Sequence, residues 1–232
     1  EAFKTGIGLN YDGQGDGSEH AVEAMCGPMS KALLVSQVIP LLNGVEEKMR
    51  TGAKVIDVGC GTGLAIELLA KTFPASTFIG YDPSSRAISV ARERFSSQEN
   101  IELFDLGAES IPSSADADFV MTLDCLHDMP RPDIALKAIH GALKTDGTLL
   151  VKEIKSSSNW VDNLRNPVLA LMYATSITTC LSSAMSDTDT LGLGTLGLNP
   201  ELLLAMTKEA GFTSFLQHKV EDPTNLYYEI SL

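Results

Sequence analysis

The sequence predicts an α/β protein with a doubly wound, mostly parallel sheet. From residue 54 onward, short apolar runs alternate with amphipathic segments of helical period. A turn with three glycines in five positions follows the first apolar run, at residues 59–63. The last two apolar runs are separated by only four residues, 221–224. Alternation of strands and helices is typical of βαβ units, which place parallel strands in one sheet.

Five strands alternate with helices in this scheme, and a hairpin closes it. The strands are expected at 54–58, 77–81, 101–104, 118–123 and 148–154. The helices are expected at 62–72, 84–95, 133–144 and 200–210. The final runs, 213–220 and 225–232, are too close for a parallel crossover, so they are expected to pair antiparallel. The expected fold is a Rossmann-like sheet of seven strands, mostly parallel, with helices on both faces.

The chain is expected to divide into an N-terminal cap and one large domain. Residues 1–50 begin as a Gly-rich arm and continue with helical periodicity, which predicts an arm and helical cap. Residues 51–232 are expected to form the main domain, with 155–200 as an insertion before the last helix. We interpret this insertion as a lid over an acceptor pocket. The chain starts at Glu1 rather than Met, so an N-terminal domain could be missing.

Composition narrows the classes of partner. A formal net charge of −13 argues against nucleic acid, because phosphate binding requires a basic face. The four cysteines are scattered without a C-x-x-C pair, which indicates a reducing, cytoplasmic location, free thiols and no structural zinc. The uncharged stretch 166–186 contains Pro167 and seven Ser or Thr, so we interpret it as a lid helix rather than a membrane span.

The glycine turn lies where ligands bind in open parallel sheets, beyond the carboxyl end of a strand. Its spacing, Gly59-x-Gly61-x-Gly63, differs from the G-x-G-x-x-G of dinucleotide sites. Asp57, inside the first strand, would repel a pyrophosphate and attract a cation. Asp82, about 20 residues beyond the glycines, is placed to accept hydrogen bonds from ribose hydroxyls. A nucleoside that carries a positive charge and no phosphate describes S-adenosylmethionine (SAM). Taken alone, the glycines could simply form a turn, and Asp82 could simply cap the helix that follows it.

Four segments in order extend this interpretation to a family. "VIDVGCGTG", "FIGYDPS", "LGAESIP" and "FVMTLDCLHDMPRPDIALKAIHGALKTDGTLLVKE" resemble the motif set of the class I SAM-dependent methyltransferases, over about residues 50–232. "AFKTGIGLNYD" and "LGLGTLG" resemble a branch whose members often carry a winged-helix-like domain before the catalytic one.

The resemblance implies a set of cofactor residues. It comprises Asp57, Gly59, Cys60, Gly61, Gly63, Asp82, Pro83, Gly107, Ala108 and Asp124. The glycines would pass under the methionine and ribose, and Asp82 would hold the ribose hydroxyls. Gly107 and Ala108 would bracket the adenine. Many relatives have Asp at the position of Gly107, so Asp105 and Glu109 are the candidates to replace that carboxylate.

Catalysis is expected near the segment "LDCLHDMPRP", which lies beside the cofactor methyl in this fold. Methyl transfer needs a base only where the acceptor loses a proton, as a hydroxyl does. His127 is the candidate base, because its ordinary pKa lies near neutrality, and Asp128 is its candidate partner. The alternative is that His127 packs beside the cofactor and Asp128 caps a helix. No metal is expected, because Lys152-Glu153 stands where an Asp, Asp, Asn set for Mg²⁺ would be required.

The acceptor pocket is expected to combine the arm and the insertion, with Tyr11, Trp160, Met172, Tyr173 and Cys180 as candidates. Such a mixture would enclose a largely apolar small molecule, although a core helix is the alternative for any one residue. The predicted function is methyl transfer to a small organic acceptor, foremost a hydroxyl, with nitrogen or carboxylate as other acceptors. No nucleic-acid or membrane partner is expected. A catalytically silent SAM-binding regulator is the alternative, and a nicotinamide-dependent oxidoreductase is a weaker one.

Overall fold

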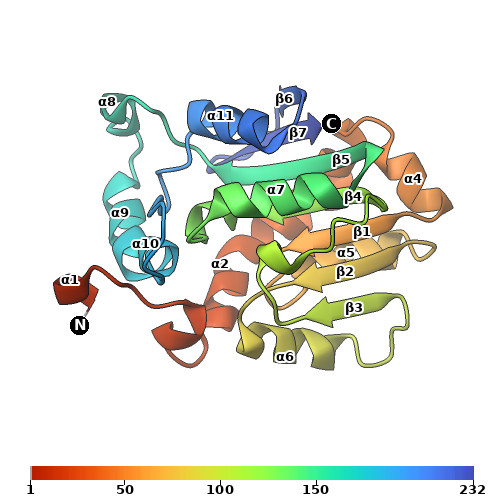
Figure 1. Ribbon diagram of the computed structural model, residues 1–232, viewed down its shortest axis with the longest axis horizontal. Helices are drawn as coiled ribbons and strands as arrows, with labels where there is room; N and C mark the ends of the chain where they lie inside the picture. Colours follow the sequence, from red (N-terminus) through yellow and green to blue (C-terminus); the bar gives the residue numbers. More distant parts are fainter. Residues whose placement is uncertain (1) are drawn as a thin grey trace.

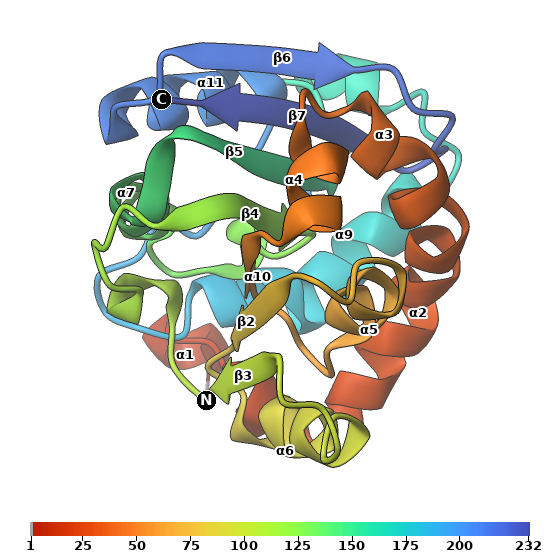
Figure 2. The ribbon, with the colours of Figure 1, turned by 90° about the vertical axis from the view of Figure 1, so that its right-hand side faces the viewer.

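The protein is built on one seven-stranded sheet, and the computed structural model describes it over residues 2–232, apart from the side chain of Phe3. The strand order is β3-β2-β1-β4-β5-β7-β6, and Figure 2 shows the sheet from β3 at the bottom to β6 at the top. β1 to β5 pair in parallel, whereas β7 pairs antiparallel with both β5 and β6. The expected Rossmann-like fold with a C-terminal hairpin is confirmed.

The strands follow the sequence pattern closely. They are β1 (Lys54–Val58), β2 (Thr77–Tyr81), β3 (Ile101–Phe104), β4 (Ala117–Leu123), β5 (Leu143–Ile154), β6 (Ser214–His218) and β7 (Asn225–Ser231). β5 begins five residues earlier than expected, because Leu143 pairs with Ala117 before the register shifts to Phe119 opposite Thr148. The expected helix 133–144 was therefore too long at its end, since Leu143 belongs to the strand.

The helices lie between the strands and in two further groups, at the N-terminus and before the last helix. They are α1 (Ala2–Thr5), η1 (Tyr11–Gln14), α2 (Ser18–Leu33), the π-helical η2 (Leu34–Val38), α3 (Ile39–Leu41), α4 (Val45–Thr51), α5 (Leu64–Thr72), α6 (Ser85–Arg94), η3 (Ala108–Ser110), η4 (Leu126–Asp128), α7 (Pro132–Ala142), α8 (Trp160–Asn163), α9 (Leu169–Thr178), α10 (Cys180–Ala184) and α11 (Pro200–Ala210). The first group forms the arm and cap, and α8 to α10 form the insertion.

The side chains of each strand point alternately to the two faces of the sheet, so the core consists of two clusters, one on each face. Val55 and Phe119 pack with α2 to α6, whereas Ile56 and Val120 pack with α7 and α11. Successive side chains of a strand point to opposite faces, so strands covered on both faces must be apolar almost throughout. Figure 1 shows α7 lying across the front of the strands. This arrangement leaves the carboxyl ends of β1, β2 and β4 free to form a site.

The helical run Ser18–Leu41 is long and apolar. Among the described residues it is the one helix long and apolar enough to cross a membrane by those two criteria alone. Its C-terminal half packs in the core through Leu33, Leu34 and Ile39. Its middle approaches α5 so closely that a Cβ added at Gly27 would lie 3.0 Å from Leu64 Cδ2. In this structure the run is therefore a packed element of the domain.

The arm and the insertion lie side by side, although they are far apart in the sequence. Figure 1 shows α9 and α10 next to the N-terminal arm. The backbone N–H of Gly8 donates to Met185 O at 2.8 Å, and that of Leu9 donates to Ser182 Oγ at 2.9 Å. Gly8 is required here, because an added Cβ would lie 2.0 Å from Ser182 O. The arm is thus held against the insertion by hydrogen bonds from its backbone N–H groups.

Candidate functional site

A cavity of about 540 Å³ lies beyond the carboxyl ends of β1, β2 and β4. Eleven of the residues proposed from the sequence line it, and they come from the arm, β1, the glycine turn and the loops after β2, β3 and β4. They are Tyr11, Asp57, Gly59, Cys60, Gly61, Asp82, Pro83, Gly107, Glu109, Asp124 and Asp128. The volume lies within the range of about 300 to 1,000 Å³ that small-molecule sites occupy.

The three glycines of the turn have different roles. All three have positive φ, at 73°, 54° and 83° for Gly59, Gly61 and Gly63. A Cβ at Gly59 would lie 2.6 Å from Cys125 Cβ, and one at Gly63 would lie 2.5 Å from Phe95 Cε2. A Cβ at Gly61 would meet nothing within 4 Å. Gly59 and Gly63 are therefore needed for packing, whereas Gly61 faces open space in the cavity.

Two carboxylates lie close together where the turn meets β2. Asp82 accepts hydrogen bonds from the backbone N–H groups of Gly61 at 2.8 Å and Ser84 at 2.9 Å. Asp57 is almost completely buried. Burial, and after it the charge of Asp82, raises the pKa of Asp57 to about 8. Burial likewise raises the pKa of Asp82. This pair will attract a cation and hydrogen-bond donors, and will repel a phosphate.

The loop after β3 contains an acid that faces the cavity. Glu109 lines the cavity together with Gly107, and a Cβ at Gly107 would lie 2.4 Å from both Glu109 carboxylate oxygens. Asp105 instead forms an ion pair with Arg92 at 3.2 Å and is not part of the lining. Ala108 is buried and also lies outside the lining. Of the two acids proposed to replace the usual Asp, Glu109 is the one that lines the cavity.

The loop after β4 holds a chain of polar side chains that ends at the cavity. Tyr11 Oη donates to Asp128 Oδ2 at 2.6 Å. His127 Nδ1 lies 2.6 Å from Glu153 Oε2, and Nε2 lies 3.1 Å from Asp128 Oδ1. Asp128 lines the cavity, whereas His127 is buried behind it and does not. The sequence named both residues but could not tell which of them meets a ligand.

Burial and nearby charges shift the pKa values of these polar side chains. Burial on its own lowers the pKa of His127, but Asp128 and Glu153 together raise it well above its ordinary value. Burial and the charge of Asp128 raise the pKa of Tyr11, so its hydroxyl stays protonated and donates. Each ring nitrogen of His127 faces a carboxylate. Of His127 and Asp128, only Asp128 lines the cavity and can contact a ligand there.

Asp124 is held by two buried partners that the sequence did not suggest. It adopts a left-handed backbone conformation with φ 58°. Lys152 forms an ion pair with its carboxylate, and the amide of Asn225 donates to it. Both partners are buried, on β5 and β7. Lys152 was noted only as part of an argument against Mg²⁺, because pairing across strands is not visible in the sequence.

The arm bridges the two ends of the cavity. Asp12 accepts hydrogen bonds from Ser84 Oγ and, at 3.1 Å, from the backbone N–H of Ser85, two and three residues after Asp82. Gln14 Nε2 donates to Thr179 O at 3.1 Å, in the insertion. With the bond from Tyr11 to Asp128, the arm contacts the loop after β2, the loop after β4 and the insertion.

The insertion contributes less to the cavity than expected. Only Ser183, Ser186 and Asp187 line it from this segment. Trp160, Met172, Tyr173 and Cys180 lie outside the lining, with Trp160 63% exposed. Ser176 is the buried residue of α9, so most of this apolar helix faces outward. Apolar residues around the whole helix gave no sign of which side packs.

Several lining residues were missed because they lie on the cap. Glu19, Glu23, Cys26 and Ser30 come from α2. Glu23 also accepts a hydrogen bond from Thr62 in the glycine turn and pairs with Arg94 at 2.8 Å. The face that α2 presents depends on its packing against α5, which the sequence alone does not specify.

Part of the chain is similar in sequence to known proteins. Residues 56–149 match the model of a family described as methyltransferase domain. The trans-aconitate 2-methyltransferase of Variovorax paradoxus is 32% identical over 122 residues, which is 53% of this chain and 44% of the relative. The chain thus spans less than half the length of that curated relative.

Solved structures show the same fold over nearly the whole chain. PigF with SAH (S-adenosylhomocysteine) has a TM-score of 0.70 at 15% identity and covers 100% of this chain and 65% of its own. Human N-acetylserotonin methyltransferase in complex with SAM has a TM-score of 0.65 at 16% identity, with coverage of 99% and 64%. At these identities the likeness concerns the fold.

Proposed function

We propose that this chain, which carries a methyltransferase domain with the class I SAM-dependent fold, transfers the methyl group of SAM to a small organic acceptor. One observation supports this most directly: a single cavity connects the glycine turn and Asp82 with Asp128 and Tyr11. A donor bound at the first end would present its methyl group toward the second.

The cofactor residues are proposed from their place in the cavity. Asp82 would accept from the ribose hydroxyls, and Asp57 would face the ammonium group of the methionine part, whose charge suits a buried carboxylate. Glu109 would face the adenine amino group. The remaining proposed cofactor residues are Gly59, Cys60, Gly61, Gly63, Pro83, Gly107, Ala108 and Asp124. Gly63 and Ala108 would act by shaping the turn and the loop, since neither lines the cavity.

The proposed reaction is an in-line displacement at the sulfonium. A lone pair of the acceptor oxygen forms the C–O bond, the C–S bond breaks, and its electron pair neutralises the sulfur. The hydroxyl proton passes to the carboxylate of Asp128, which lines the polar end of the cavity with Tyr11 and has His127 behind it. Holding donor and acceptor in line supplies much of the acceleration.

The charge of the cavity favours a neutral acceptor over an anionic one. Arg131 is the single cation in the described lining, and it is paired with Asp133 at 2.7 Å and with Asp189. Glu19, Glu23 and Asp187 add negative charge. A carboxylate would be repelled by these groups. A hydroxyl is therefore the proposed acceptor, with an amine as the second choice, although the relative from Variovorax is named for a carboxylic acid.

The wider assignments are also proposals. Residues 1–50 would act as arm and cap and 155–200 as the outer cover of the acceptor end, within a main domain of 51–232. A winged-helix-like domain preceding these residues stays a prediction from the resemblance. We propose a cytoplasmic location and a small-molecule partner, with no nucleic-acid or membrane partner, on the basis of the negative charge and four free cysteines.

Turnover with a panel of small acceptors tests the proposal. Methyl-labelled SAM should yield labelled product with phenolic or aliphatic hydroxyl compounds, and Asp128→Asn should lose turnover while retaining SAH binding. Tight SAH binding without turnover on hydroxyl, amine or carboxylate acceptors would favour the silent regulator instead. Absence of SAH binding would contradict both.

A further inference from the structure

A second cavity lies at the end of the insertion that is farther from the arm. Its volume is about 380 Å³, and it is bounded by the loop after β5, α8, the start of α9 and the start of β7. Figure 1 shows α8 at the opposite end of the insertion from α10. None of its described lining residues lines the larger cavity. The first part of the insertion therefore lines a space of its own.

The charge of this second cavity is opposite to that of the larger one. Lys155 and Arg165 line it, and Asp162 is the one acid in its described lining, which leaves one net positive charge. In the larger cavity the acids outnumber Arg131, the single cation of the described lining. In a chain with a net charge of −13, a cavity with a surplus of positive charge favours an anionic ligand at that place.

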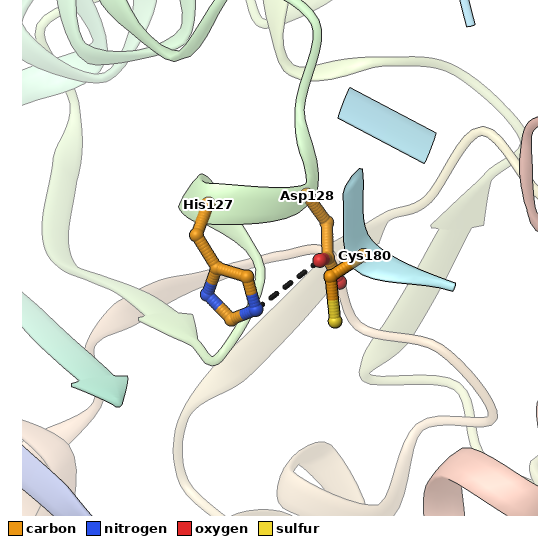
Figure 3. Close-up of side chains that lie close together, drawn as sticks. All are labelled: His127, Asp128 and Cys180. Atoms are coloured by element: carbon orange, nitrogen blue, oxygen red, sulfur yellow. Dashed lines mark ion pairs between the residues drawn. The ribbon is translucent and has the colours of Figure 1, made fainter. Parts of the chain in front are cut away.

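Lys155 lacks the partner that would neutralise it. Figure 3 shows such a pair at the larger cavity, where a dashed line joins His127 to Asp128 at 3.1 Å. Lys155 is half-buried and forms no ion pair with a described carboxylate, and its Nζ donates to the main-chain carbonyl of Asp222. The carboxylate of Asp222 accepts hydrogen bonds from other groups, at 2.7 to 3.1 Å. An ammonium group has three N–H donors, so Lys155 retains two for a ligand.

Ser156 adds an unused hydroxyl beside this ammonium group. Its Oγ is buried and has no hydrogen-bond partner among the described residues. Buried hydroxyls in folded proteins nearly always have a partner, which is protein, water or a ligand. Ser156 follows Lys155 in the chain, and both residues line the cavity. One ligand with oxygen acceptors would satisfy the hydroxyl and neutralise the lysine together.

The loop that carries these donors is held in place by its own hydrogen bonds. The backbone N–H of Lys155 donates to Thr224 O at 2.8 Å. The side chain of Asn163 contacts both backbone groups of Ser157: Oδ1 accepts from its N–H at 2.9 Å, and Nδ2 donates to its carbonyl at 3.1 Å. A ligand would therefore meet donors that are already positioned, which reduces the entropy lost on binding.

The remaining lining is apolar, and one cation stands at the edge. Leu169, Leu196 and Leu226 provide apolar surface. The Arg165 side chain is 86% exposed and lies 4.0 Å from Asp162, so it can turn toward a ligand at little cost. A guanidinium group binds carboxylate oxygens in pairs. The cavity thus combines a cationic side with an apolar side.

We propose that this cavity binds a small organic carboxylate. Lys155, Ser156 and Arg165 would hold the carboxylate group, and the apolar part of the ligand would contact the leucines. A carboxylate carries one negative charge, which matches the single net positive charge of the lining, whereas a phosphate monoester would exceed it. The inference does not rest on the proposed function, because this site and the larger cavity have separate linings.

Titration of the whole chain with benzoate tests the proposal. Calorimetry in about 0.15 M salt, which screens long-range charge effects, should show one saturable site. Benzamide keeps the ring without the charge and should not bind. Phenyl phosphate should bind more weakly than benzoate. Absence of saturable benzoate binding would overturn the proposal, and tighter binding of phenyl phosphate would overturn the assignment to carboxylates.

A pair of lysine variants locates the site. Lys155→Met keeps most of the apolar stem and should weaken benzoate binding by about tenfold or more, since a charged hydrogen-bond donor is lost. Lys137→Met is the matched control: it removes the same charge at an exposed position on α7, outside both cavities, and should bind benzoate as the parent protein does. Equal benzoate affinity in Lys155→Met and the parent protein would overturn the proposal.

A third variant excludes loss of folding as the explanation. Arg165→Gln changes an exposed side chain, so its circular dichroism should match that of the parent protein, while benzoate affinity should fall severalfold. Full benzoate affinity in this folded variant would remove Arg165 from the site. SAH binding is measured on the same proteins and should be unchanged in all three variants. Benzoate binding without SAH binding would reject the proposed function and leave this inference standing.

Discussion

The two ends of the cavity differ in how they are built. The cofactor end consists of a turn and loops that follow directly from strands, and its parts are close in sequence: Gly59 to Gly63, then Asp82. The acceptor end is assembled from the arm, η4 and the insertion, so Tyr11 meets Asp128 across 117 residues. Local chemistry specifies the first end, and long-range packing specifies the second. Substitutions at the two ends should therefore fail in different ways.

The largest expected effect is on stability, at the base of the glycine turn. Gly59→Ala should reduce the free energy of unfolding by about 3 kcal/mol, because the added Cβ meets Cys125 Cβ at 2.6 Å and φ is 73°. Gly44→Ala is the matched control: its φ is 71°, but its added Cβ meets nothing within 4 Å. Denaturant unfolding should show a loss of only about 1 kcal/mol for the control. If both variants lost the same free energy of unfolding, backbone strain alone would explain why residue 59 is glycine.

The second effect is a pH dependence of cofactor binding that comes from Asp57. Its raised pKa, about 8, means that Asp57 is mostly protonated in the free protein at pH 7. An ammonium group bound beside it favours the carboxylate, so binding releases a proton and SAH affinity should rise by roughly 50-fold from pH 6 to pH 8. Calorimetry in buffers of different ionisation enthalpy would detect the released proton.

Stability of the free protein should change in the opposite direction over this range. A carboxyl group whose pKa is raised by folding binds more protons folded than unfolded, so its contribution falls as pH rises from about 4 to 8. Asp57→Asn should flatten both profiles. An affinity that stays constant with pH in the parent protein would contradict the placement of the ammonium group at Asp57.

A third, smaller effect separates Gly61 from its neighbours. Gly61→Ala should cost only about 1 kcal/mol of stability, because its φ is 54° but its added Cβ meets no protein atom within 4 Å. The Cβ would enter the cavity instead, so SAH affinity should fall by about tenfold or more, equivalent to about 1.4 kcal/mol. Unchanged SAH affinity with normal stability would show that the ligand does not pass this glycine.

The smallest effect is expected on the outer side of the insertion. Trp160→Ala should change the free energy of unfolding by less than about 0.5 kcal/mol, because the side chain is 63% exposed and lies outside the cavity. SAH binding and turnover should also be unchanged. A loss of turnover in this variant would return Trp160 to the acceptor pocket that the sequence predicted.

The fold was predictable because its signals are local. Apolar runs of five or fewer residues bounded by polar turns located β1, β2 and β3, and the close spacing of the last two runs predicted the hairpin. Leu143 was misassigned, because an apolar residue at a helix end and one at a strand start look alike in sequence. Its pairing with Ala117 distinguishes the two cases.

The acceptor end was less predictable for a physical reason. Side chains such as Trp160 and Tyr173 are apolar and could pack on either side of a short helix, and only tertiary contacts select the side. Glu153 and Cys180, which approach His127 and Asp128, carry no local pattern that marks them. A chain this acidic offers many carboxylates, so type and position alone do not identify those that converge.

Calorimetric titration with SAH, on the parent protein and on Asp82→Ala, determines whether the glycine turn and Asp82 bind the cofactor. The parent protein should have one site with micromolar affinity. The variant should lose at least about 100-fold in affinity, because the ribose acceptor and the bond to Gly61 N–H disappear together. Equal affinity in the two proteins, or no binding to the parent protein, would contradict the assignment of the glycine turn and Asp82 to a SAM site.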